Sequence, residues 1–229
     1  MATQKQTDNR TLILDQAEKL LFIVGRDAVT IHAVADAAKV QAPTIYRLFG
    51  DKRGLLDAVA ERGFLRYMDD DQGYVKQSDL IEELRNGWDF HVKFGLTNPE
   101  LYALMYDESH YPNLSPAAKI AHKGFEELIK QLAEGGYLKV NQEQAIFTIF
   151  ASASGAVRSL FALPQPSNVD DYCKYIRESM VTLVTTQPVD NKPNQIANAA
   201  ITLSANIDKL GILSSSESEL LKDWMTRIK

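Results

Sequence analysis

Apolar residues recur along this chain at intervals of three and four, the spacing of one face of an α-helix. We find no strand-like alternation of useful length and no repeat at a fixed period, so the pattern predicts an all-α protein. The helices predicted after the first fifty residues span 53–68, 78–97, 99–106, 115–134, 142–163 and 169–186. Gly135-Gly136 and Pro164-Gln165-Pro166 mark two of the breaks between them.

Three shorter helices are predicted in the first fifty residues. The first has an apolar stripe and a C-terminal stop at Gly25, the second an N-cap at Thr30, and the third begins at Pro43 and ends at Gly50. The inward-facing residues of the three are Ile13, Ala17, Leu20, Leu21 and Val24; Ile31, Val34, Ala35 and Ala38; and Ile45, Leu48 and Phe49. The connection over 39–41 is too short for anything but a tight turn, so the order is that of a helix-turn-helix motif.

This stretch resembles the N-terminal domain of the TetR family of transcriptional repressors, over roughly residues 8–64. The residues that carry the resemblance are Thr30, Val34, Ala35, Ala38, Val40, Pro43, Thr44, Ile45, Tyr46, Arg47, Phe49, Lys52 and Leu55. Two positions depart from the family pattern. Lys39 stands where glycine is usual, which costs about 1 kcal/mol if the residue adopts a left-handed conformation, and Leu48 replaces a common histidine.

The resemblance implies a DNA-binding face on the third helix. Gln41, Ala42, Thr44 and Arg47 are expected to face the major groove, while Thr30, Tyr46 and Lys52 hold backbone phosphates. Pro43 points the same way, and Lys39 can reach a further phosphate. The alternative for Tyr46 is half-buried packing.

Charge is divided unevenly along the chain. The net charge is −5. Residues 1–53 carry 8 basic and 6 acidic residues, which leaves 17 basic and 24 acidic residues in 54–229. An acidic body is repelled by DNA, so only the first part should contact it.

Composition also indicates the cellular compartment. The single cysteine, Cys173, excludes an intrachain disulfide framework. The polar start, residues 1–10, does not resemble a signal peptide, so the cytoplasm is expected. Residues 145–163 are almost uncharged, but they include Arg158 and several serines; this favours a buried helix over a membrane span.

Three domains are predicted: a DNA-binding head over 1–52, a ligand-binding and dimerisation domain over 53–187, and a helical extension over 188–229. The small residues of 152–156 and an apolar stripe on 169–186 could form either a homodimer interface or an ordinary core. The stripe comprises Tyr172, Ile176, Leu183 and Val184. One recognition helix reads few base pairs, which favours a homodimer on a palindromic double-stranded operator with half-sites about 34 Å apart.

The extension is predicted to form two helices, over 194–210 and 216–228. Ser216 with Glu219 fits a capping box. The apolar stripe of the second helix contains a tryptophan and should pack on the body or on a partner subunit; it comprises Leu220, Leu221, Trp224, Met225 and Ile228.

A repressor of this kind needs a cavity for a small-molecule effector, and aromatic residues with a few polar groups could form its walls. The predicted lining comprises Trp88, His91, Val92, Gly95, Tyr102, Met105, Tyr106, Phe125, Phe147, Phe150 and Ser154. With little cationic lining, a neutral, aromatic or amphipathic effector is favoured. The alternative is that these residues simply fill the core.

Metal binding and catalysis have weak support in the sequence. A metal site could form only if helix and loop brought together His91, Asp107, Glu108, His110 and His122, none of which has metal-ligand spacing on one helix. No catalytic signature or cofactor motif is present. The sequence thus favours a ligand-responsive DNA-binding repressor, over a helical sensor or carrier that does not bind DNA and over a helical enzyme.

Overall fold

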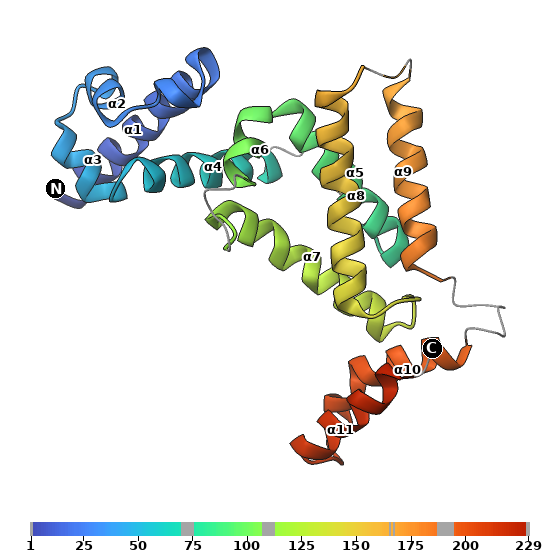
Figure 1. Ribbon diagram of the computed structural model, residues 1–229. Helices are drawn as coiled ribbons and strands as arrows, with labels where there is room; N and C mark the ends of the chain where they lie inside the picture. The colour runs from blue at the N-terminus through green and yellow to red at the C-terminus, as the bar shows by residue number, and fades with distance from the viewer. Residues whose placement is uncertain are drawn as a thin grey trace. The chain divides into compact units, whose positions relative to one another are not determined.

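The computed structural model describes residues 2–69, 76–106, 113–164, 166, 168–186 and 195–227. These residues form helices and turns, with one isolated β-bridge between Leu138 and Thr185 (Figure 1). The predicted all-α class is confirmed. The chain divides into two compact units: unit 1 is Met1–Gln72 with Phe94–His122, and unit 2 is Gly73–Lys93 with Lys123–Lys229.

Unit 1 contains the predicted helix-turn-helix. Its elements are α1 (Ala2–Val24), a short 3₁₀ helix η1 (Arg26–Ala28), α2 (Ile31–Ala38), α3 (Ala42–Phe49), α4 (Lys52–Asp69) and α6 (Pro99–Met105). α1 ends before Gly25, whose φ of 88° suits only glycine without strain. The core contains Ile13, Leu14, Ala17, Leu21, Val34 and Ile45. Val24, the last residue of α1, was predicted to face inward but is exposed.

α4 is held to its neighbours on two sides. Arg62 donates to Asp15 at 2.7 Å and to Glu18 at 2.6 Å, and Arg66 forms a second ion pair with Glu18. On the α6 side, a Cβ at Gly63 would lie 2.6 Å from the Leu101 side chain, so only glycine allows this close approach. The first helices and α6 are thus both fixed to α4.

Unit 2 contains most of α5 (Leu80–Thr97) and α7 (Pro116–Glu134), together with α8 (Gln142–Ala162) and α9 (Val169–Val184). The predicted bounds of these helices are correct to within two residues. Asp79 caps α5 by accepting from the backbone N–H groups of Ile81 and Glu82. Asn141 and Gln144 form a capping box at the start of α8.

α8 passes a length and composition test for a membrane span. Its inward face, however, is buried within its own chain: Ala145, Ile149, Ala153, Ala156, Val157 and Leu160. α8 packs against α9, whose Met180, Val181 and Val184 are also buried. These contacts are those of a core helix in a folded domain.

Ion pairs join α5 to α9. Arg85 donates two hydrogen bonds to Glu178 at 2.9 and 3.0 Å, and Arg177 pairs with both Glu178 and Asp89. Hydrogen bonds from Arg85 lower the pKa of Glu178 below its ordinary value, and Arg177 adds to the effect. Burial raises the pKa of Asp89, which Arg177 partly offsets.

The C-terminal extension forms α10 (Gln195–Asn206), a 3₁₀ turn η4 (Ile207–Leu210) and α11 (Ser215–Thr226). It reaches the end of α7, where Asn206 donates to the Glu134 carbonyl at 3.2 Å and Lys209 pairs with the Glu134 side chain. The predicted capping box at Ser216 is wrong: Ser214 caps α11 and Glu217 closes the box. In the predicted stripe, Leu220 and Trp224 remain about half exposed.

Candidate nucleic-acid interface

The turn between α2 and α3 sets the angle of the recognition helix. Thr30 caps α2 by accepting from the Ala33 N–H at 3.1 Å. Lys39 follows α2 with φ 52° and ψ 40°, the left-handed conformation that the sequence implied. Its N–H donates to the Ala35 and Asp36 carbonyls, which fixes the backbone in that state. Val40 N–H donates to the Ala35 carbonyl at 3.0 Å and completes the turn.

α3 has one buried side and one exposed side. Ile45 is fully buried, and Leu48 and Phe49 are partly covered. The Arg10 guanidinium lies 5.3 Å from the centre of the Phe49 ring, a cation–π contact between α1 and α3. The back of α3 is therefore fixed against the rest of unit 1.

The predicted DNA-contacting residues all remain accessible. Gln41, Pro43, Tyr46 and Arg47 are exposed, and Ala42 and Thr44 are partly so. Tyr46 is 51% exposed, which favours a DNA contact over the packing alternative. Gln41 occupies the N-cap position but makes no side-chain cap bond, so its amide can serve another partner.

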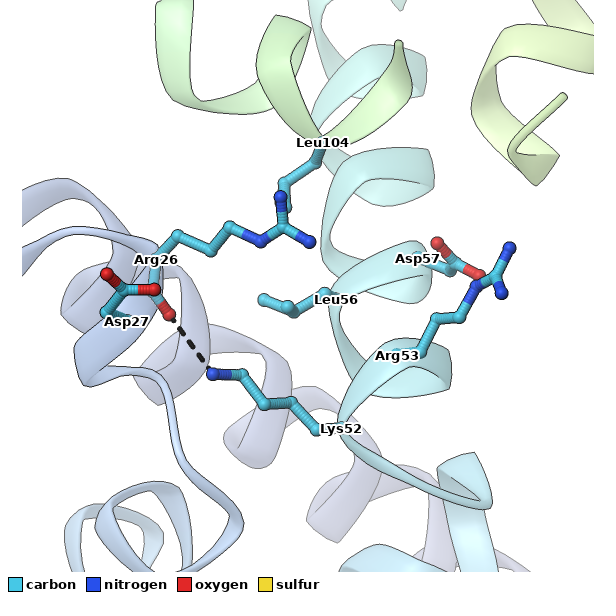
Figure 2. Close-up of a pocket in the computed structure, with 7 residues that line it drawn as sticks. All are labelled: Arg26, Asp27, Lys52, Arg53, Leu56, Asp57 and Leu104. Carbon is cyan, nitrogen blue, oxygen red and sulfur yellow. Dashed lines mark hydrogen bonds between the residues drawn. The ribbon is translucent and has the colours of Figure 1, made fainter. Parts of the chain in front are cut away.

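Three further residues that are expected to hold phosphates lie near this face. Thr30 and Lys39 are exposed beside the turn. Lys52, at the start of α4, donates to the Arg26 carbonyl at 3.5 Å (Figure 2). The sequence did not indicate a role for Arg26. It lies in a short connection between helices, which is too short to show a repeating pattern of apolar residues.

The predicted effector-cavity residues fall into two groups, one in each unit. Unit 1 contains Gly95, Tyr102, Met105 and Tyr106; unit 2 contains Trp88, His91, Val92, Phe125, Phe147, Phe150 and Ser154.

The group in unit 1 belongs to an aromatic cluster. Phe94 contacts Phe64, Tyr67 and Tyr102 with ring centres 5.3, 5.0 and 6.4 Å away, and Tyr102 lies 4.7 Å from Tyr106. Burial raises the pKa of the Tyr106 phenol well above its ordinary value, so this group stays neutral. The cluster is an apolar wall with phenol groups along it.

In unit 2, α5 and α8 contact each other through Trp88, His91 and Phe150, while Phe125 lies on α7 and is partly covered. Trp88 Nε1 donates to Ser152 Oγ at 3.0 Å, and the rings of His91 and Phe150 meet edge-on at 6.1 Å. Ser154, one turn after Phe150, has a buried hydroxyl with no hydrogen-bond partner among the described residues. A buried hydroxyl without a partner is costly and marks a position where a bound molecule could supply one.

Phe147 does not belong to this wall. Its side chain is 76% exposed, and Ala151, Gly155 and Arg158 continue the same outer side of α8 at helical spacing. The prediction that placed Phe147 in the cavity is wrong, because an aromatic residue was assumed to face inward. This outer side, residues 147, 151, 155 and 158 together with the half-exposed Phe161, is called the α8 outer face below.

Some of the residues predicted for dimer contact are also buried within the chain. Ala153 and Ala156 are buried within their own chain, and so is Val184. Among residues 151–156 of α8, the exposed ones are Ala151 and Gly155. On α9, Tyr175 and Leu183 are more than half exposed.

Among the described residues, no group of three His, Cys, Asp or Glu is placed to hold a metal ion. His91 instead contacts Phe150. Asp107, Glu108 and His110 lie outside the described residues.

An all-α protein whose N-terminal domain is a helix-turn-helix with an exposed recognition helix is a DNA-binding protein by architecture. Residues 13–59 match the family model described as "Bacterial regulatory proteins, tetR family". Residues 13–59 thus form a TetR-family helix-turn-helix domain, which is the DNA-binding domain of a transcriptional regulator.

Solved structures share the fold over most of the chain. A TetR-family transcriptional regulator from Haemophilus influenzae is 19% identical, with 80% of this chain and all of that chain covered and a TM-score of 0.56. RolR, solved in complex with resorcinol, is 22% identical, with 80% and 91% covered and a TM-score of 0.60. A transcriptional regulator from Saccharomonospora viridis in complex with choline is 16% identical, with 79% and 100% covered and a TM-score of 0.60. No curated protein matches the sequence.

Proposed function

We propose that this regulator is a homodimeric repressor that binds a palindromic operator in the cytoplasm and is released by a small neutral, aromatic or amphipathic molecule. The observation that carries the proposal is the exposed front of α3, whose back is held by the buried Ile45. Gln41, Thr44 and Arg47 stand on that front, with Lys39 and Lys52 beside it. Amide and guanidinium groups read base edges, and lysines bind phosphates.

Dimerisation is supported by the α8 outer face. Phe147 and Phe161 are exposed there, with the small residues Ala151 and Gly155 between them. Space around Gly155 is open, since a Cβ there would meet nothing within 4 Å. Small residues let a second helix approach closely, and flanking aromatic rings bury apolar area, so a second copy of α8 fits this face. A two-fold axis through it would present two recognition helices to one operator.

Release by a small molecule is supported by the partly polar wall of unit 2. Trp88 and Phe150 supply apolar surface, and the Ser154 hydroxyl needs a partner. The wall has no lysine or arginine among its predicted members, which disfavours an anionic effector. Complexes of two similarly folded regulators with resorcinol and with choline are consistent with small organic effectors for this fold.

Selection from randomised duplex DNA with the purified full chain tests the proposal. We expect a two-fold symmetric site. Arg47→Ala should cost about 1–3 kcal/mol of binding free energy per contact and relax the preference at one position in each half-site. Lys52→Ala is the matched control, because losing a phosphate contact weakens all duplexes about equally. An unchanged preference in the Arg47→Ala variant would show that the recognition face is assigned wrongly.

A further inference from the structure

Unit 1 contains a cavity that the DNA-binding role does not use. It has a volume of about 430 Å³ and lies between η1, the first turns of α4 and Leu104 of α6 (Figure 2). All of its lining residues belong to unit 1. It is separate from the aromatic and serine-lined walls assigned to the effector.

Two cations line this cavity from different elements, Arg26 of η1 and Lys52 of α4. Figure 2 shows the Lys52 side chain extending toward η1, while the Arg26 side chain crosses toward Leu104. The Lys52 ammonium uses one of its three N–H donors on the Arg26 carbonyl, at 3.5 Å. A guanidinium fork matches the two oxygens of a carboxylate, and an adjacent ammonium strengthens the same contact.

The floor of the cavity is apolar. Leu56 and Leu104 are only 5% and 4% exposed, and Figure 2 places the Leu56 side chain between those of Arg26 and Lys52. A ligand in this space would therefore touch the exposed edges of these leucines while its charged group met a cation. That arrangement suits an amphipathic molecule better than a bare ion.

The acidic residues of the lining limit the charge of the ligand. Arg26, Lys52 and Arg53 contribute three positive charges, and Asp27 and Asp57 contribute two negative ones. One net positive charge favours a monoanion. A phosphate dianion would exceed this net charge by one.

We propose that this cavity binds a small organic monoanion, a carboxylate attached to an apolar group, through Arg26 and Lys52 over Leu56 and Leu104. Because Lys52 is also the proposed phosphate contact, the ligand carboxylate and the DNA backbone compete for one ammonium. This competition rests on the proposed function, whereas the site itself does not.

The test uses the full chain with labelled leucine methyl groups, benzoate as the probe and benzamide as its neutral counterpart. Benzoate should shift the Leu56 and Leu104 methyl signals saturably, and benzamide should not. Arg26→Ala should weaken benzoate binding at least tenfold. Lys19→Ala is the matched control, because Lys19 is exposed on α1 outside the cavity and should leave binding unchanged. Equal effects of the two ligands, or no loss in the Arg26→Ala variant, would overturn the site.

A second measurement separates the site from the competition. Saturating benzoate should weaken operator binding by the parent protein more than by Arg26→Ala, with benzamide as the reference. Saturable methyl shifts with unchanged operator affinity would support the site and overturn the competition. Operator binding measured without benzoate tests the proposed function independently, so its failure cannot be confused with failure of the site.

Discussion

Lys39 is the one residue other than glycine that has positive φ in the described part of the chain. Its φ of 52° and ψ of 40° lie in the left-handed region, where a Cβ crowds the following carbonyl at about 1–2 kcal/mol. The turn cannot relax by rotating this residue, because the Lys39 N–H is bound to the Ala35 and Asp36 carbonyls. Replacement by glycine should remove the strain, while replacement by alanine should keep it.

The size of the effect follows from two opposing quantities. Removing the strain gains about 1–2 kcal/mol, and the extra freedom of glycine in the unfolded chain takes back about 0.5–1 kcal/mol. Lys39→Gly should therefore be more stable than Lys39→Ala by about 0.5–1 kcal/mol, or roughly 1–4 °C in Tm for a chain of this size. Both variants lose the same ammonium, so the comparison isolates the backbone.

Denaturant unfolding and salt-dependent operator binding together check this reasoning. If Lys39 holds a phosphate, both variants should flatten the plot of log affinity against log salt by about 0.9 per contact. Equal stability of the glycine and alanine variants would refute the strain argument. An unchanged salt slope in both would refute the phosphate contact and leave the strain argument intact.

Four further outcomes are expected. Gly155→Glu should convert the dimer to monomer in light scattering, because it buries a charge, whereas Gly124→Glu, at another exposed helical glycine with open space, should not. Ser154→Ala should weaken any effector found by thermal-shift screening about tenfold while leaving the Tm without effector unchanged or higher, since the hydroxyl has no described partner; a lower Tm would contradict this. Because the pKa of Glu178 is lowered in the folded protein, its ionised side chain stabilises the fold fully above its ordinary pKa of 4.5. This stabilisation is lost as the pH falls through the lower folded-state pKa. Glu178→Gln should therefore lose less stability than the parent between about pH 5 and 3. Deleting 188–229 should lower the Tm and increase dye binding, and unchanged values would show that the extension is dispensable.

The head was predictable because its signals are local. A threonine N-cap, a turn of three residues and an N-terminal proline each act within one turn of helix, so Thr30, Lys39 and Pro43 determine the geometry without distant contacts. The left-handed state at Lys39 was expected from the family resemblance, in which glycine is usual at this position. The buried back of α3 followed from spacing alone, as Ile45 confirms.

The outward side of α8 could not be predicted in the same way. Ala151 and Gly155 are exposed, whereas Ala153 and Ala156 are buried. All four are small residues that allow close packing, so the sequence alone does not show which two face the core. The position of α9 decides this, and that position depends on contacts between distant parts of the chain. Phe147 was misplaced for the same reason.

Capping at α11 was ambiguous within the sequence itself. Ser214 with Glu217 and Ser216 with Glu219 both satisfy the spacing of a capping box. The structure uses the first pair, and Glu217 accepts from both the Ser214 N–H and its hydroxyl. Lys222 of α11 also pairs with Asp208 at 2.6 Å, a contact that the local pattern does not reveal.

α4 is the element through which an effector could act on DNA binding. Arg62 and Arg66 hold the buried carboxylate of Glu18, so α1 should follow any displacement of α4. Gly63 lies between those arginines and admits the Leu101 side chain of α6 so closely that neither helix can slide without displacing the other. A displacement of α6 should therefore displace α4 and α1 by a similar distance. In a dimer, this would change the spacing of the two DNA-binding heads. A tenfold change in operator occupancy requires only about 1.4 kcal/mol of preference between the two states, which one or two effector contacts can supply.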